Sequence, residues 1–461
     1  MRFNYRQFID RLKVSYWFVP VLMGALAILM ARFILYLDTL IPNSVLATKD
    51  YIFSGTPDQA RAIMVGILGT SLGTAGIVFS LLTVPFSVVV SQYGSRLLRI
   101  FMRDRTFQLV LGVFTTTIAY SLTVSLAIPP SIVETDTPQI ATTIGLLLAL
   151  ATVASLIALI HHIGTSLQAP NLVAEAGAEL REVVRFGATF AEKVQVHGDP
   201  AEAEAGLAKI EQEGFNIHAT DTGYIQAIDP EGVSDLAHRY DLVIQFIRKP
   251  GDFIQPGVLI ARAWSPGRFD HEELIEHIRR TYLLGNQRTP TQDVEYAVMQ
   301  LAEIAVRAMS PAINDPYTAR TCLHHIAAGL SLYISQGERM PFFFDRDGRL
   351  RLIYEPVTFN ELLESAFGML RRVGRENAEV LGAILTAIEQ IAQKTQQLKA
   401  RAELLEQVQL VEAENHASKS VDWDRERIHQ RCTNLVELLS DNKNPGRMIA
   451  NNVREKHGRS N

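Results

Sequence analysis

A short polar segment has the residue types and the spacing of a small binding site. Residues 310 to 316 read Ser-Pro-Ala-Ile-Asn-Asp-Pro. Pro311 disfavours helical geometry at the residue before it, whereas an aspartate followed by proline is typical of a helix N-cap and first helical residue. The spacing therefore predicts a sharp corner between two helices. We expect the polar residues around this corner to converge: Asp293, Arg307, Ser310, Asn314 and Asp315.

Two interpretations of the corner are open. In the functional one, its carboxylates, guanidinium and amide bind a small ligand or a protein partner of unidentified chemistry. In the structural one, the aspartates cap their helices, and an Asp–Arg ion pair holds the corner together.

We expect neither a metal, nor a cofactor, nor an enzymatic activity. Cys322 and His325 share a helical face, but no second Cys or His pair completes a tetrahedral ligand set. The chain has no glycine-rich phosphate loop, no nucleophile elbow, and no paired carboxylates that can be placed in a cleft. Its 44 Lys and Arg residues are outnumbered by 49 Asp and Glu residues, which argues against nucleic-acid binding driven by bulk basicity.

A second group of residues could border a path through a membrane. Within an apolar run at about 62–90, four glycines recur at steps of three and four, which places them on one helical face: Gly66, Gly69, Gly73 and Gly76. They are accompanied by hydroxyl side chains and by a proline that predicts a kink: Thr70, Thr74, Ser80, Thr83 and Pro85. Small residues let helices approach closely in lipid, so the stripe predicts a packing seam. Repeated around a symmetric oligomer, the same stripe would instead line a narrow pore.

The elements that must position these residues belong to two different solvents. Of the 461 residues, 48% are hydrophobic, and nearly all of the long uncharged runs precede residue 161. Four runs reach the roughly 20 residues that a helix needs to cross a bilayer, at about 16–37, 62–90, 107–128 and 140–160. Backbone groups in lipid must be satisfied within their own segment, so we expect four transmembrane helices in a domain at 1–168.

Basic residues in the short flanking loops indicate the orientation. Arginines and a lysine precede the first span, and four arginines lie between the second and third spans: Arg96, Arg99, Arg103 and Arg105. Both termini are therefore expected in the cytoplasm, which makes the chain a multi-pass protein of a bacterial inner membrane.

The rest of the chain is hydrophilic and is expected to be cytoplasmic. Short β-prone runs predict an α+β module at 169–286, followed by a helical module at 287–412 and a charged tail at 413–461. Apolar residues at heptad spacing predict a long coiled-coil helix that meets either a neighbouring subunit or the chain's own helices: Leu381, Ile384, Ile388, Ile391, Thr395, Leu398, Ala402 and Leu405. The fold class is thus a mainly α membrane protein with an α+β cytoplasmic domain.

Several of these segments resemble a known family. The dipeptides Arg288-Thr289 and Gln292-Asp293, and the run from Arg307 to Ala319 with its Ser-Pro-x-Ile-Asn-Asp-Pro motif, are similar to a bacterial family of predicted membrane proteins of unknown function. The resemblance covers nearly the whole chain. It implies four N-terminal spans followed by a cytoplasmic part, and it implies no reaction.

Two functions agree with these features. The first is an oligomeric channel or transport protein, with the second span at the axis and the cytoplasmic domain as its gate. The alternative is a membrane-anchored cytoplasmic sensor or scaffold that binds a small ligand or a protein. The expected partners are the lipid bilayer and further copies of the chain, and nucleic acid is not among them.

Overall fold

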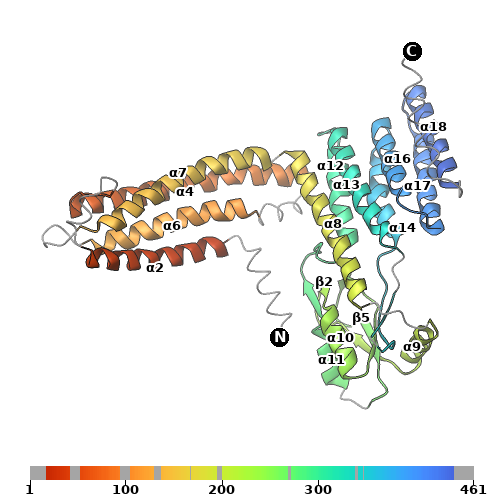
Figure 1. Cartoon of the computed structure of the whole chain (residues 1–461). Coiled ribbons are helices and arrows are strands. Elements are labelled where there is room, and N and C mark those ends of the chain that lie inside the picture. The colour runs from red at the N-terminus through yellow and green to blue at the C-terminus, as the bar shows by residue number, and fades with distance from the viewer. Residues whose placement is uncertain are drawn as a thin grey trace. The chain divides into compact units, whose positions relative to one another are not determined.

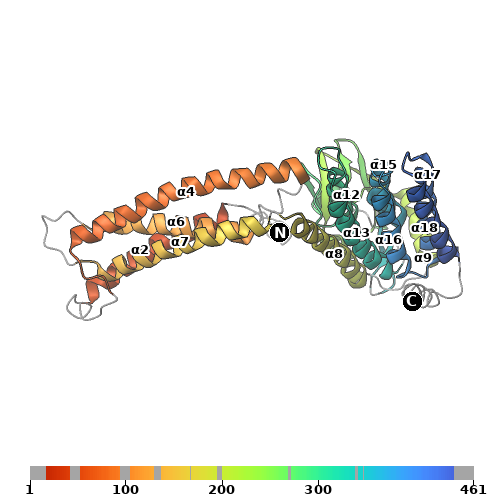
Figure 2. The same ribbon diagram turned by 90° about the horizontal axis from the view of Figure 1, so that it is seen from above.

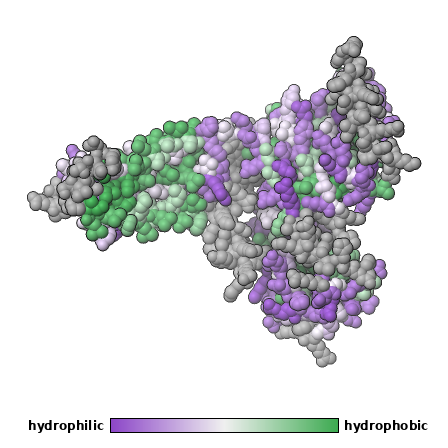
Figure 3. Space-filling model, viewed as in Figure 1, coloured by the Kyte–Doolittle hydropathy of each residue, from purple (hydrophilic) through white to green (hydrophobic). Residues whose placement is uncertain are grey.

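The computed structural model describes residues 17–41, 52–93, 104–128, 137–166, 168–194, 200–267, 271–337, 341–345 and 347–440. The chain forms two compact units, Met1–Leu172 and Val173–Asn461. In Figure 3, apolar side chains cover much of the first unit, and hydrophilic side chains predominate on the second. The expected fold class, four apolar helices followed by a domain of helices and sheets, is confirmed.

Among the described residues, four helices of the first unit are long and apolar enough to cross a membrane (Figure 1). They are α2 (Phe18–Leu40), α4 (Pro57–Tyr93), α6 (Arg105–Ala127) and α7 (Gln139–Ser166). The shortest have 23 residues. At 1.5 Å per residue such a helix is about 34 Å long, which exceeds the roughly 30 Å of the hydrocarbon core.

Helices α6 and α7 each pack against the other three helices of this bundle, and the more extensive contacts are those of α6. The largest buried side chains of α6 are Phe107, Phe114 and Tyr120. Glycines allow the close approach of its neighbours: a Cβ at Gly24 of α2 would overlap Thr115, and a Cβ at Gly145 of α7 would overlap Met64 of α4. The packing seams of the bundle therefore run through glycines of α2, α6 and α7.

Polar contacts set the register between the first and last helices of the bundle. Asp38, buried in the last turn of α2, accepts hydrogen bonds from the backbone amides of Ile140 and Ala141, both at 2.9 Å. The hydroxyl of Tyr120 donates to the carbonyl of Ala141, also at 2.9 Å. The first amides of a helix lack partners within the helix, and they carry partial positive charge that favours a carboxylate. Asp38 thus caps α7 from a different helix.

The second unit begins with helices α8 (Ala169–Val194) and α9 (Pro200–Glu213) and contains two sheets. The five-stranded sheet has the order β1 (Phe215–His218), β5 (Leu259–Trp264), β3 (Val243–Phe246), β8 (Leu350–Tyr354) and β7 (Phe342–Phe344). The three-stranded sheet has the order β4 (Phe253–Ile254), β2 (Gly223–Ile228) and β6 (Tyr282–Gly285). Helices α10 (Pro230–Arg239) and α11 (His271–Arg279) accompany these sheets, whose core includes Ile217, Leu242, Ile244 and Ile260.

Strands β7 and β8 come from a segment that was expected to be helical. Strand β8 pairs in parallel with β3, and the other pairs of both sheets are antiparallel. The five-stranded sheet therefore crosses the expected boundary at residue 286. One edge of β3 pairs with β5, and the backbone groups of its other edge pair with β8.

The helical part of the second unit comprises α12 (Val294–Ala308), α13 (Pro316–Ser335), α14 (Phe359–Leu363), a π-helical turn (Glu364–Gly368), α15 (Met369–Val373), α16 (Ala378–Ala392), α17 (Leu398–Ala417) and α18 (Asp422–Ser440). Figure 2 shows several of these helices side by side. Helix α16 packs against α13, α17 and α18 of the same chain.

The heptad-patterned stretch is divided between α16 and α17, with a break at residues 393–397. The predicted seam is buried in α16, but Leu398 at the start of α17 is 66% exposed, and α17 instead buries Leu404 and Val408. The break shifts the register, so one continuous coiled-coil helix does not form. The expected tail boundary at residue 413 falls within α17, and α18 packs against α16 and α17. Residues 441–461 lie outside the described part of the chain.

Candidate functional site

The predicted corner is present between α12 and α13. The backbone amides of Ile313 and Asn314 donate to the carbonyl of Ser310 at 3.0 and 2.9 Å. The amide of Asp315 donates to the carbonyl of Ala308 at 2.7 Å. Asn314 has a φ of 47°, a left-handed conformation that asparagine tolerates better than most residues. A tight backbone turn therefore makes the corner.

Asp315 caps α13 as predicted. Its carboxylate accepts hydrogen bonds from the backbone amides of Tyr317 (3.1 Å) and Thr318 (3.0 Å) and from the hydroxyl of Thr318 (2.5 Å). Since these bonds use both carboxylate oxygens, the geometry supports the structural interpretation of this residue.

The five residues expected to converge form two separate groups. Asp293 is the N-cap of α12, whereas Arg307 lies in its last turn, so 14 residues or about 21 Å of helix separate them. Arg307 pairs with Glu303 one turn earlier, at 3.1 Å. The expected convergence of Asp293 with Arg307 and the corner is therefore wrong, and the length of α12 is the reason.

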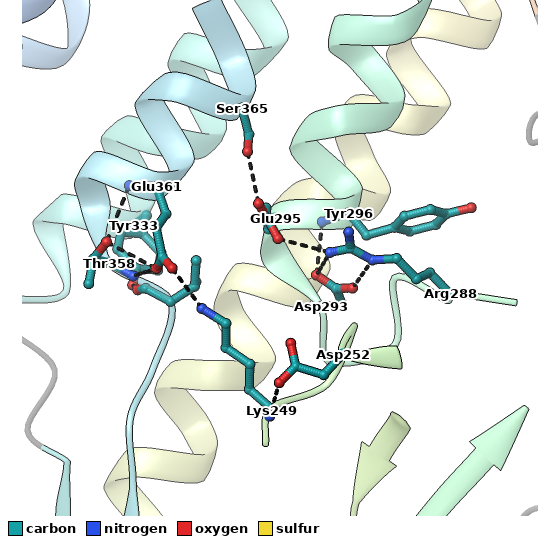
Figure 4. Close-up of polar contacts among 11 residues, drawn as sticks. Lys249, Asp252, Arg288, Asp293, Glu295, Tyr296, Tyr333, Thr358, Glu361 and Ser365 are labelled. Carbon is teal, nitrogen blue, oxygen red and sulfur yellow. Dashed lines mark hydrogen bonds and ion pairs between the residues drawn. The ribbon is translucent and has the colours of Figure 1, made fainter. Parts of the chain in front are cut away.

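The arginine partner of Asp293 is Arg288, which precedes α12 (Figure 4). Its Nε and a terminal nitrogen lie 2.8 and 3.0 Å from the two oxygens of Asp293, which is a bidentate geometry. The same terminal nitrogen lies 3.0 Å from Glu295, and the guanidinium carbon is 5.4 Å from the centre of the Tyr296 ring. We call Arg288, Asp293 and Glu295 the Arg288 cluster.

Within the Arg288 cluster Asp293 is buried, Arg288 and Glu295 are partly exposed, and both carboxylates are hydrogen-bonded. The side chain of Asp293 is 3% exposed, and it also accepts the backbone amide of Tyr296 at 2.9 Å. The second oxygen of Glu295 accepts a hydrogen bond from Ser365 at 3.0 Å. Burial by itself would lower the pKa of Arg288, but the bonds to Asp293 and Glu295 outweigh it and raise that pKa, so the guanidinium stays charged.

A turn between β3 and β4 covers the Arg288 cluster. Gly251 in this turn has a φ of 100°, and a Cβ there would overlap the carboxylate of Asp293. Lys249 of the same turn reaches the other way, with its Nζ 3.0 Å from Glu361, and Glu361 completes a capping box with Thr358 at the start of α14. The Arg288 cluster and this turn thus join the sheet part of the second unit to its helical part.

The glycine face of α4, defined by Gly66, Gly69, Gly73 and Gly76, lies open. A Cβ at any of these four positions would meet no atom within 4 Å. The buried side of α4 is the opposite one, which carries Ala60, Met64, Ile67, Ser71 and Val78. Within the described residues of a single chain, the glycine face is therefore not the packing seam that one interpretation predicted.

The hydroxyls beside the glycine face are satisfied within the helix. Thr70 donates to the carbonyl of Gly66 at 2.8 Å, Thr74 to that of Thr70 at 2.8 Å, and Thr83 to that of Phe79 at 3.1 Å. Ser80 is exposed, and α4 continues as one helix through Pro85. The face therefore presents small, uncharged side chains, and the hydroxyls of Thr70, Thr74 and Thr83 already have acceptors within the helix.

Cys322 and His325 are used in packing. Cys322 is fully buried in α13, and a Cβ at Gly177 of α8 would overlap the ring of His325. The Nδ1 of His325 lies 3.4 Å from a guanidinium nitrogen of Arg181. Burial, followed by the charge of Arg181, lowers the pKa of His325.

Elsewhere in the described part of the chain, three side chains could share a metal ion. They are Glu412, His416 and His429, whose donor atoms all lie within 4.8 Å of one another. The sequence interpretation missed this group, although Glu412 and His416 have the i, i+4 spacing of two side chains on one helical face.

Comparison with known proteins agrees with the resemblance found in the sequence. A family model described as "Predicted membrane protein (DUF2254)" matches residues 13–390, a range that ends before α17 and α18. Uncharacterized proteins of Mycobacterium bovis and Mycobacterium tuberculosis are each 29% identical to the chain over 402 residues, which covers 84% of this chain and 74% of theirs. No solved structure matches the chain significantly.

Proposed function

We propose, on the premise that the chain belongs to the DUF2254 family of predicted membrane proteins, that it forms an oligomeric membrane channel with the glycine face of α4 bordering the conduction path. In this proposal the second unit lies in the cytoplasm and controls access to that path. The excess of arginines between the second and third apolar segments supports this orientation.

The observation that carries the proposal is the open glycine face of α4. From Gly66 to Gly76 it extends over ten residues, or about 15 Å, which is half of a hydrocarbon core of roughly 30 Å. Small residues on a membrane helix favour close approach to another helix, and within the described chain no helix covers this face. Further copies of α4 around an axis would cover its edges and leave a narrow, uncharged path between them.

A second candidate is the membrane-anchored sensor or scaffold. It is favoured by the size of the second unit, which comprises 289 of the 461 residues (461 minus 172) and has its own hydrophobic core. Against it, two of the groups expected to bind a ligand at the corner already have partners: the carboxylate of Asp315 caps α13, and Arg307 pairs with Glu303. The channel therefore has the stronger support.

The channel is tested with full-length protein in liposomes, by measuring the release of potassium ions and of a small neutral solute. We expect release above that of empty liposomes, and we expect Gly73→Leu to reduce it while chemical cross-linking still captures the oligomer. The matched control is Ala25→Leu, which enlarges a small exposed residue of α2. Intact, correctly inserted protein that releases nothing would contradict the channel and favour the anchored sensor.

The orientation is tested with Tyr317→Cys in intact cells and a membrane-impermeant thiol reagent. Tyr317 is 70% exposed, and the native Cys322 and Cys432 are buried, so the background is low. We expect labelling only after the cells are opened. Labelling of intact cells would reverse the proposed topology.

A further inference from the structure

The two C-terminal helices place three metal-binding side chains around one point. Glu412 and His416 lie one turn apart on α17, and His429 faces them from α18. One oxygen of Glu412, Oε1, is 2.9 Å from Nε2 of His416 and 2.6 Å from Nδ1 of His429. The imidazole rings have centroids 6.1 Å apart. Neither the channel nor the sensor function uses this group.

The helices that carry these residues are held in register along their length. At the closed end of the α17–α18 hairpin, buried Asn415 donates to the carbonyl of Arg425 at 2.9 Å. At the other end, Arg401 of α17 donates to the carbonyls of Leu438 and Leu439 of α18. Side chains on such rigid elements keep their relative positions, which a metal site requires.

Glu412 provides a second, independent observation. Its other oxygen, Oε2, is buried and accepts no hydrogen bond from a described N–H or O–H group, and the weakly donating thiol of Cys432 is the neighbour that interacts with this carboxylate. Buried polar atoms are rarely left without a partner, and an unmodified carboxylate in this position needs a cation or a donor. The carboxylate therefore has acceptor capacity that the two histidines do not fill.

We propose that Glu412, His416 and His429 bind one divalent transition-metal ion of the zinc class. Two imidazoles and one carboxylate are a ligand set that Zn²⁺ accepts, commonly with water in the fourth position. Side-chain exposures of 72% for His416 and 50% for His429 leave that position open to solvent. Each histidine binds through the nitrogen that now faces Glu412, after the proton leaves that nitrogen or moves to the other ring nitrogen.

The observed distances between the three side chains are compatible with a metal ion taking the place of the protons between them. Zinc bonds of about 2.1 Å in a tetrahedron place neighbouring ligand atoms about 3.4 Å apart. To reach that value, the present separations of 2.6 and 2.9 Å from Oε1 must lengthen by about 0.8 and 0.5 Å, and a separation at the upper limit of 4.8 Å must shorten by about 1.4 Å. Side-chain rotation alone can supply shifts of this size, so the helices need not move.

The ion would tie α17 to α18. Because it binds the folded hairpin and has no preformed site in the unfolded chain, it stabilises the folded state by mass action. The site lies beyond the segment shared with the family, so the proposal concerns this chain and not the family as a whole.

The test uses full-length protein in detergent, expressed without a polyhistidine tag and treated with a chelator. Zn²⁺ and Co²⁺ binding is measured by competition titration, and thermal unfolding is followed with and without Zn²⁺. We expect one ion per chain and a higher Tm with Zn²⁺. His416→Ala and Glu412→Gln should each weaken binding by about tenfold or more, whereas His238→Ala, an exposed histidine of α10, should leave it unchanged.

Because His416 is largely exposed, His416→Ala is expected to keep the fold, which an unchanged Tm without metal verifies. Equal affinity of wild type and His416→Ala would overturn the proposal, and so would a Tm that does not respond to Zn²⁺. Co²⁺ spectra check the ligand set: nitrogen and oxygen ligands give no thiolate charge-transfer band. Appearance of that band would assign the ion to Cys432 or Cys322 and overturn the set proposed here.

Discussion

Replacing Arg288 alone should destabilise the protein more than replacing Arg288 and Asp293 together. In Arg288→Met, a carboxylate that is 3% exposed loses both guanidinium hydrogen bonds and keeps only the amide of Tyr296. Removing one partner of a buried ion pair costs about 3–5 kcal/mol, because the other charge stays buried. In Arg288→Met/Asp293→Asn, the asparagine still caps α12, and the one carboxylate left without Arg288 is Glu295, which is 29% exposed and keeps Ser365, so we expect a loss of about 1–2 kcal/mol.

The pH dependence of the single variant provides a check on the cause. Burial raises the pKa of Asp293, and Arg288 opposes that shift, so removing Arg288 raises the pKa further. A carboxyl whose pKa is higher in the folded than in the unfolded state destabilises the fold fully above its folded pKa, and this penalty shrinks as pH falls below that value and is gone below the unfolded pKa. The stability difference between wild type and Arg288→Met should therefore shrink on acidification, whereas that of the double variant should not.

Thermal unfolding in detergent, followed by circular dichroism, measures these differences. A domain of 150–250 residues shifts its Tm by about 2–4 °C per kcal/mol, so the double variant should unfold roughly 4–8 °C above the single variant. The matched control is Arg307→Met, which removes a partly exposed pair with Glu303 and should cost less than about 1 kcal/mol. A double variant that is no more stable than Arg288→Met would show that Asp293 is not left as an uncompensated charge, and would refute this reasoning.

Three further outcomes are expected. Gly24→Val should lower thermal stability by about 1–3 kcal/mol, because the valine side chain would overlap Thr115. Gly69→Val, on the open face of α4, should have a much smaller effect on the monomer. Comparable losses of the two variants in detergent unfolding would contradict the packing described. Asp38→Ala should lower the free energy of unfolding by about 2 kcal/mol, since two amides of α7 lose a charged acceptor. The purified variant should therefore be digested faster by a protease. An unchanged digestion rate would argue against the cap. Burial alone would raise the pKa of Glu361, but hydrogen bonds from Thr358 and Lys249 lower it. The stabilisation that Glu361 contributes is therefore present above its unfolded pKa and is lost as pH falls through its folded pKa. Glu361→Gln should flatten the acid limb of a Tm-against-pH curve, and a limb identical to that of the wild type would count against this cause.

Much of the local structure could be predicted from the sequence, because local signals determine it. The four apolar runs correspond to α2, α4, α6 and α7 with ends that differ by a few residues, and the β-prone runs at 223–228 and 258–264 correspond to β2 and β5. The corner was predicted from proline and aspartate alone, since the backbone restrictions of Pro311 and the capping preference of Asp315 act within a few residues.

What could not be predicted depends on pairing between distant residues. Strand β8 joins β3 across about a hundred residues of chain, and periodicity within Leu350–Tyr354 does not reveal that partner. Asp293 pairs with Arg288 and not with Arg307, because the length of α12 separates Asp293 from Arg307. The heptad pattern did not indicate the break in the helix at 393–397. The metal-binding group was missed because His429 meets Glu412 only when α18 folds back on α17.

The contact between Asp38 and α7 also constrains how the protein is made. Asp38 belongs to α2, and the amides that it binds leave the ribosome 102 and 103 residues later. Until the last helix of the bundle has entered the bilayer, this carboxylate lacks the partners that compensate its burial. A nascent chain cut off after α6 therefore carries a carboxylate in the last turn of α2 without the two amides that it binds in the complete bundle.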